Sequence, residues 1–409
     1  MQLADVPLLL MLAGLAAYAV LGGADFGAGF WQLTGGRGER ARAIREHAHH
    51  AMGPVWEANH VWLIFVLVVC WTAYPEAFGS IASTLAVPLF VAGLGIILRG
   101  TAYALRSGTE TMREQRRVEV VFALSSILTP FALGAMVGGI ASGRVPVGNA
   151  KGDLVTSWLN PTSALIGTIA VASAAYLAAV YLAADAVRSG RDDLSRAFRA
   201  RALAMGVVAG AIAFAGLAVV HSDASRIWDG LTSGAGSGAV AVSAAGGVAT
   251  LALVWRSRFE PARATAAVAV AAIIAGWALA QRPYFLPGLT IEEAAASRSA
   301  LVAVIVSIAI GAVVLVPSLG LLFALVLRGR FDEHPSEPVP VGDRRVPIEQ
   351  LRPTLGRVAV ACLAVGVCLM LLFEAAWAHA VGVVALFGFL ATGFVALATI
   401  AAAGDTGSD

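Results

Sequence analysis

The residue types best suited to chemistry gather in two short segments near the start of the chain. One segment, GPVWEANHVWLI, places a carboxylate, an amide and an imidazole at Glu57, Asn59 and His60, where a long apolar run begins. The other, GGADFGAGFW, places Asp25 among glycines at the close of the first apolar run. An acidic side chain at the edge of a membrane helix is costly, so it is a candidate for a functional role. If the two helices are antiparallel neighbours, both acids lie at the same side of the membrane.

Asp25 and Glu57 each allow two interpretations. They could relay protons, because a carboxylate partly withdrawn from water can exchange protons near neutral pH. Alternatively, Asp25 only reaches a tightly packed, glycine-rich interface, and Glu57 only complements the helix dipole in its first turn. His60 lies three residues from Glu57 on the same helix face, and it is either a hydrogen-bonded structural histidine or a haem ligand. Glu57 is the better candidate to pass protons inward, because Asn59 and His60 can continue a hydrogen-bonded chain.

Three further side chains could support such a site. Trp56 fits either an interfacial aromatic belt or helix packing. Arg99 ends another apolar run, with Tyr103 one turn further on, and its simplest alternative role is that of an anchor at the membrane surface. The sequence contains no phosphate-binding loop, no dinucleotide-binding glycine pattern and no paired-histidine metal motif. It therefore predicts no catalytic residue and no metal ligand in this chain, and it leaves cofactor-binding residues undefined.

The composition indicates the class of protein that holds these residues. Of the 409 residues, 58% are hydrophobic and only 13% are charged, and the mean hydropathy is +0.80. Soluble domains carry about 25% charged residues, so we predict an all-α, polytopic bundle of transmembrane helices. The net charge of +2 gives no indication of nucleic-acid binding. The first apolar segment lacks a basic start and is predicted to be a retained span rather than a cleaved signal.

Apolar runs long enough to cross a bilayer, about 20 residues each, divide the chain. They predict spans near 6–27, 55–73, 81–104, 119–142, 161–186, 202–221, 237–255, 264–281 and 299–327, then two runs near 358–373 and 379–403. We therefore expect a nine-helix domain over 1–330, a charged cytoplasmic connector over 331–357, and a C-terminal extension with two helices over 358–409.

The arginines orient these spans. Loops after odd-numbered spans are rich in arginine, whereas the loop 74–80 has none. The loop after the first span, for example, contains Arg37, Arg40, Arg42 and Arg45. Because basic residues accumulate in cytoplasmic loops, we expect the odd-numbered loops to be cytoplasmic and the N-terminus to lie outside. Asp25 and Glu57 are then expected near the cytoplasmic face.

Together these residues resemble subunit II of cytochrome bd-type quinol oxidases, in order over residues 5–330. The matching segments are ADFGAGF at 24–30, residues 53–64, Leu98-Arg99-Gly100 with Tyr103 and Arg106, Asn160-Pro161, and residues 283–296.

The resemblance implies a heterodimer in the bacterial cytoplasmic (inner) membrane, in contact with lipid. Its partner, subunit I, would carry haems b and d and oxidise quinol, and the complex would reduce oxygen to water. The family associates proton intake with acids at the cytoplasmic ends of the first helices of subunit II, and these positions match Asp25 and Glu57. A small single-helix accessory subunit and a structurally bound quinone are further components that the resemblance allows.

The sequence departs from the family pattern at three places. Leu21-Gly22-Gly23 stands where the family usually has Leu-Asp-Gly, and Ala104 follows Tyr103 where the family usually has an acid. The C-terminal pair of helices exceeds the nine-span pattern. Two other functions remain open at this point: a proton-coupled secondary transporter, and a structural assembly partner in which both acids are inert.

Overall fold

The computed structural model describes residues 2–34, 38–50, 56–105, 112–327, 352–373, 375, 377–378, 380–389 and 392. The chain divides into two compact units, Met1–Phe331 and Asp332–Asp409.

The described part of the first unit consists of helices and one short hairpin. In chain order these elements are α1 (Asp5–Ala17), the π-helical turn η1 (Tyr18–Gly22), α2 (Gly23–Thr34), α3 (Glu39–His50), α4 (Trp56–Ala73), α5 (Pro75–Thr84), α6 (Ala86–Leu105), α7 (Met112–Ala141), α8 (Pro161–Arg188), α9 (Asp192–Asp223), α10 (Ser225–Thr232), α11 (Gly234–Trp255), α12 (Phe259–Gln281), β1 (Tyr284–Leu286), β2 (Leu289–Thr290), α13 (Ile291–Ala294) and α14 (Arg298–Leu327). The two strands are antiparallel, with Tyr284 opposite Thr290.

The predicted all-α membrane bundle is confirmed. Among the described residues, eight helices are long and apolar enough to cross a membrane, and they correspond to eight of the nine predicted spans. The other predicted span, 55–73, corresponds to α4, whose apolar part Asn59–Ala73 is shorter. The described chain is therefore a polytopic helical protein, as its composition predicts.

Two span boundaries differ from the prediction. The first helical run continues from Asp5 to Thr34 instead of ending at 27, so Asp25 lies inside a helix and not at its end. The predicted third span, 81–104, is interrupted between α5 and α6. Pro88 has no N–H to donate to the carbonyl of Thr84, so a continuous helix would lack that hydrogen bond.

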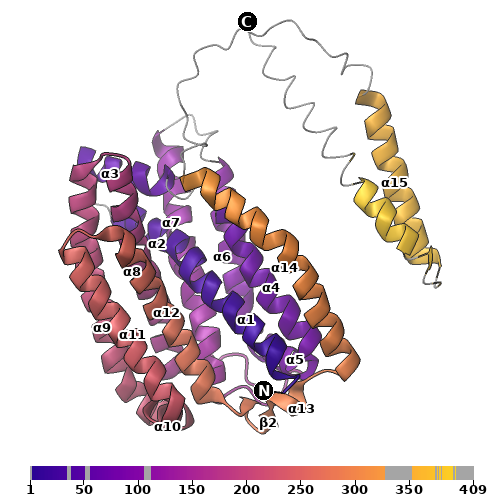
Figure 1. Cartoon of the computed structure of the whole chain (residues 1–409), viewed down its shortest axis with the longest axis horizontal. Coiled ribbons are helices and arrows are strands. Elements are labelled where there is room, and N and C mark those ends of the chain that lie inside the picture. Colours follow the sequence, from indigo (N-terminus) through magenta and orange to yellow (C-terminus); the bar gives the residue numbers. More distant parts are fainter. Residues whose placement is uncertain are drawn as a thin grey trace, which may run out of the picture. The chain divides into compact units, whose positions relative to one another are not determined.

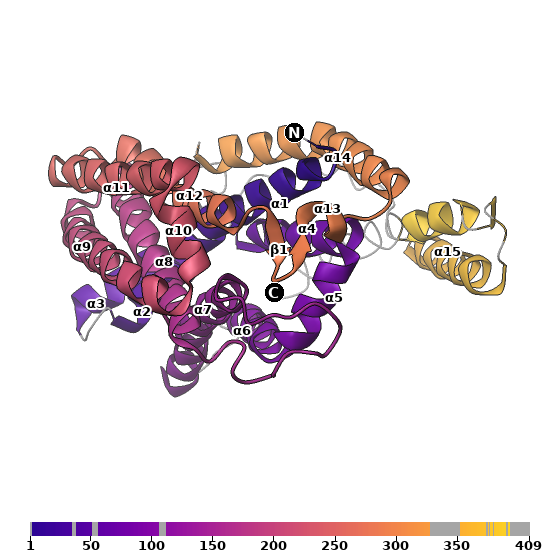
Figure 2. The same ribbon diagram turned by 90° about the horizontal axis from the view of Figure 1, so that it is seen from below.

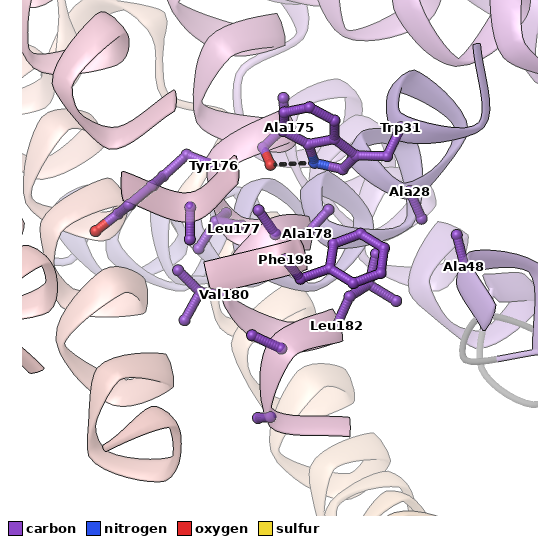
Figure 3. Packing of buried hydrophobic residues seen from close by; sticks show 14 of the residues in the cluster. Ala28, Trp31, Ala48, Ala175, Tyr176, Leu177, Ala178, Val180, Leu182 and Phe198 are labelled. Carbon is purple, nitrogen blue, oxygen red and sulfur yellow. Dashed lines mark hydrogen bonds between the residues drawn. The ribbon is translucent and has the colours of Figure 1, made fainter. Parts of the chain in front are cut away.

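Helix α8 lies at the centre of the packing. It contacts α2, α7, α9 and α12, and Figure 2 shows α9 and α11 on one side of it and α6 and α7 on another. Its run from Ala172 to Ala186 is rich in buried alanine, and such small side chains let helix backbones approach closely. Figure 3 shows this cluster, in which the indole Nε1 of Trp31 donates a hydrogen bond of 2.8 Å to the carbonyl of Ala175.

The two ends of the first unit differ in structure. Helix α3 lies at one end, and β2 and α13 lie at the other, called the hairpin end below (Figure 1). Helix α3 is held by His47, whose Nε2 lies 3.1 Å from the carbonyl oxygen of Leu182 in α8. At the hairpin end, Thr290 and Glu293 form a capping box at the start of α13.

A second polar contact at the hairpin end joins three helices. Arg144, just after α7, donates two hydrogen bonds of 3.0 and 2.6 Å to the carboxylate of Asp223, at the end of α9. Asp223 also accepts hydrogen bonds from the backbone N–H and the hydroxyl of Thr162, at 3.1 and 2.6 Å. Thr162 lies in the first turn of α8, so this ion pair fixes α7, α8 and α9 to one another.

The second unit contains α15 (Arg352–Leu372) and a shorter apolar helix, Ala380–Phe389. The two helices pack closely, because a side chain at Gly366 would overlap Leu386. Helix α15 begins before the apolar run predicted at 358. Residues 328–351, most of the predicted connector, lie outside the described residues, as do the last residues of the extension, 393–409.

Candidate functional site

Asp25 lies in the interior of the bundle because α2, the helix that carries it, packs closely on α8. The π-helical turn Tyr18–Gly22 directly precedes α2, and such turns occur frequently at functional sites. Further along α2, a Cβ atom at Gly27 would overlap the carbonyl of Ala174 in α8, so only glycine permits this approach. The close packing of α2 on α8 leaves Asp25 5% exposed.

The carboxylate of Asp25 is hydrogen-bonded to the second predicted segment. The side-chain amide Nδ2 of Asn59 donates to Asp25 Oδ2. Asn59 is 3% exposed and lies in the first part of α4, two residues beyond Glu57. Buried polar groups need such partners, since an unpaired one costs about 1–3 kcal/mol. The structure thus joins the two segments that the sequence analysis selected.

Arg99 supplies a positive charge at this place. It lies on α6, is 2% exposed, and is among the largest fully buried side chains. Its guanidinium carbon lies 4.6 Å from the ring centroid of Phe26 and 5.1 Å from that of Phe122, which are cation–π distances. Because Phe26 directly follows Asp25 in α2, this contact places Arg99 beside the segment that carries Asp25. Arg99 is therefore a buried member of the site and not only a surface anchor.

His60 lies beside this group and contacts aromatic rings. The hydroxyl of Tyr18 lies 3.4 Å from His60 Nδ1. The His60 ring is 6.0 Å from the ring of Tyr18 and 6.0 Å from that of Phe26, between centroids. Because Phe26 also lies under Arg99, these contacts place His60 and Tyr18 next to the Asp25–Asn59 pair. We call Asp25, Asn59, His60, Arg99 and Tyr18 the buried polar cluster.

The remaining predicted residues have different positions. The ring of Tyr103 contacts that of His49 in α3 in a tilted arrangement, with centroids 5.2 Å apart and an interplanar angle of 37°. The side chains of Trp56 and Glu57 lie outside the described residues.

Sequence reasoning missed three contributors to the cluster: Tyr18, Phe26 and Phe122. Tyr18 lies in an apolar run, where a tyrosine usually indicates ordinary packing. Phe26 stands beside Asp25 in the sequence, and this adjacency is the one signal that could have suggested it. Phe122 has no such signal, because only the packing of α7 on α6 brings it to Arg99.

The cluster brings a carboxylate, an amide, an imidazole, a phenol and a guanidinium together in the interior of the bundle. The described residues contain no group of three or more histidine, cysteine, aspartate or glutamate side chains that could hold a metal ion.

A comparison with known protein families shows to which family this chain belongs. The family model described as cytochrome bd terminal oxidase subunit II matches residues 3–326. This chain belongs to that family. The match extends over nearly all of the described part of the first unit, and it therefore includes the buried polar cluster.

Individual relatives within the subunit II family are distant. The chain is 26% identical over 222 residues to a protein of Bacillus subtilis (strain 168) provisionally named cytochrome bd menaquinol oxidase subunit II, covering 52% of this chain and 61% of the relative. It is 26% identical over 175 residues to cytochrome bd-I ubiquinol oxidase subunit 2 of Escherichia coli (strain K12), covering 41% of this chain and 45% of that protein. These alignments span less than two thirds of either relative.

A solved structure has the same fold. It is the bd oxidase from Geobacillus thermodenitrificans, one chain of which superposes with a TM-score of 0.63 at 23% sequence identity. The superposition covers 81% of this chain and all of that one. At this identity the likeness establishes the helical arrangement and nothing finer.

Proposed function

We propose that this chain acts as subunit II of a bd-type quinol:oxygen oxidoreductase. The observation that carries the proposal is the family match over residues 3–326. In the proposed complex, a haem-bearing subunit I carries haems b and d, oxidises quinol and reduces oxygen to water. This chain supports subunit I in the bacterial cytoplasmic membrane with its N-terminus outside.

Within that complex we propose that the buried polar cluster delivers protons from the cytoplasm. Asp25 can gain and lose a proton, and the hydrogen bond from Asn59 links it to the start of α4. His60 and Tyr18 continue the line of polar side chains beside it. Glu57, two residues before Asn59, is the proposed entry group. The charge of Arg99 makes a charged Asp25 tolerable in the interior, since a buried charge needs a compensating partner.

Composition of the purified complex tests the assembly. A tagged form of the full chain, purified in mild detergent, should bring down a second polytopic subunit with stoichiometric haems b and d in its optical spectrum. The complex should oxidise quinol and consume oxygen, and the chain expressed without its partner should do neither. A stable solitary chain that takes up a substrate with protons would instead establish the transporter alternative. Haem d bound to the solitary chain would contradict the proposal that subunit I carries the haems.

Substitution of the carboxylates tests the proton role separately. Asp25→Asn and Glu57→Gln remove the titrating groups and keep side chains of similar size. We expect both variants to assemble with a full complement of haem and to reduce oxygen more slowly. Assembled variants with wild-type turnover would assign both acids to packing, and the family assignment would be unaffected.

A further inference from the structure

The turn between α11 and α12 presents a tryptophan and two arginines at the membrane surface. Both helices are long and apolar enough to span the bilayer, so the turn that joins them lies where the bilayer meets water. The side chain of Trp255, the last residue of α11, is 68% exposed, and Val248, two turns earlier on the same face, is also 68% exposed. Arg256 and Arg258 are both exposed.

A third arginine fixes the geometry of this turn. Arg199, on α9, donates through Nε to the carbonyl of Val254 at 3.1 Å and through Nη2 to the carbonyl of Trp255. Its guanidinium carbon also lies 5.8 Å from the centroid of the Trp255 indole. These bonds supply donors to carbonyls in the last turn of α11, where the Val254 carbonyl also accepts from the Ser257 N–H at 3.0 Å. The indole and the two arginines that follow it are therefore held in place before any ligand binds.

The positive charges of Arg256 and Arg258 are not neutralised by a described side chain of this chain. Among the described residues, neither side chain forms a hydrogen bond or an ion pair with the protein. The acid nearest in sequence, Glu260, is already shared by Arg263 at 3.4 Å and Arg188 at 4.0 Å. Between 255 and 263 the chain carries three arginines and one acid, so this surface has an excess of positive charge.

We propose that this turn is a binding site for an anionic phospholipid. The headgroup phosphate binds Arg256 and Arg258, and the indole of Trp255 lies at headgroup depth. An acyl chain follows the exposed apolar face of α11 past Val248. Arginine matches phosphate because its planar fork of N–H donors can form paired hydrogen bonds with phosphate oxygens. The adjoining apolar face favours a lipid over a free phosphate ion, which would gain nothing from it.

The binding test uses the detergent-purified complex that contains the full chain. Native mass spectrometry would follow the binding of dioleoyl phosphatidylglycerol, with dioleoyl phosphatidylcholine and inorganic phosphate as competing probes. Each basic residue near an anionic lipid surface contributes about 1 kcal/mol, so Arg256→Gln/Arg258→Gln should weaken phosphatidylglycerol binding at this site about 30-fold. Trp255→Leu should weaken it less, because both charges remain.

A matched control removes the same charge elsewhere. Arg113→Gln/Arg116→Gln alters two exposed arginines near the start of α7, interspersed with acids and without a neighbouring tryptophan. This variant should bind phosphatidylglycerol as the wild type does. Equal affinity in Arg256→Gln/Arg258→Gln and the wild type would overturn the proposal. So would equal affinity for phosphatidylcholine, or displacement of the lipid by inorganic phosphate at equal concentration.

Discussion

Asp25 and Asp223 are the same amino acid in two contrasting environments. Asp223, at the hairpin end, accepts a paired interaction from Arg144 and two further hydrogen bonds from Thr162. Asp25, inside the bundle, accepts from the neutral amide of Asn59, while Arg99 lies over the rings of Phe26 and Phe122. The first carboxylate is paired directly with a charged donor, Arg144. The second carboxylate is held by a neutral donor that does not by itself require a charge.

The difference separates a structural ion pair from a candidate relay. The Asp223 carboxylate joins three helices, and both its oxygens are used, which suits a permanent contact. Asp25 is more deeply buried, and Arg99 is buried in the same part of the bundle. Buried pairs contribute little to stability compared with an apolar replacement, although breaking one is strongly destabilising. We therefore expect the two sites to respond differently to removal of one partner.

Removal of the buried positive charge should have the largest effect. Arg99→Met removes the cation–π contacts to Phe26 and Phe122, each worth about 2 kcal/mol in a desolvated interior, and it takes away the positive charge near Asp25. The thermal unfolding midpoint of the purified protein should fall accordingly. Adding Asp25→Asn to this variant should recover part of the loss, since residue 25 then carries no charge that needs a partner. A single Arg99→Met variant as stable as the wild type would show that Arg99 does not balance Asp25.

Removal of the ion pair at the hairpin end should cost less. Asp223→Asn loses its charge-assisted bonds to Arg144, but the Arg144 side chain is 35% exposed and can turn to water. Allowing for this solvent access, we expect a loss of about 1–2 kcal/mol in the free energy of unfolding. Arg144→Gln should cost a similar amount, and the double variant little more than either single one. Additive losses in this double-mutant cycle would mean that the two side chains are not coupled.

The smallest effect is expected at the exposed capping box. The hydrogen bond from the Thr290 backbone N–H, followed by that from its hydroxyl, holds the pKa of Glu293 below its ordinary value. A lowered folded pKa gives stability that is present above the unfolded pKa and is lost as pH falls through the folded one. Acidification should therefore increase backbone hydrogen exchange in α13 of the wild type relative to that in Glu293→Gln. The glutamine variant has no carboxylate to protonate. Equal pH dependence in both proteins would remove the assigned role of Glu293.

Much of the buried polar cluster could be predicted, because polar side chains stand out in an apolar sequence. The sequence analysis selects Asp25, Asn59, His60 and Arg99 on type and position, and the structure brings them together. The depth of Asp25 was not predicted. The end of the apolar run predicted the end of the span near residue 27, whereas the helix, packed on α8, continues to Thr34.

Other features depend on contacts that a single sequence does not reveal. Phe122 becomes part of the cluster only because α7 packs on α6, and Tyr103 contacts His49 because α3 folds back over the end of the bundle. In contrast, the break between α5 and α6 could have been predicted from Pro88, had its missing N–H been considered.

The central claim, that Asp25 relays protons whereas Asp223 is structural, is tested most directly by oxygen consumption. Asp25→Asn and its matched control Asp223→Asn make the same chemical change at the two sites. The rate per haem d of each assembled complex should be measured at saturating quinol from about pH 6 to about pH 9. We predict that Asp25→Asn slows turnover about tenfold or more, increasingly so as pH rises and protons become scarce, whereas Asp223→Asn keeps the wild-type rate at every pH. Wild-type turnover of Asp25→Asn across this range would contradict the claim.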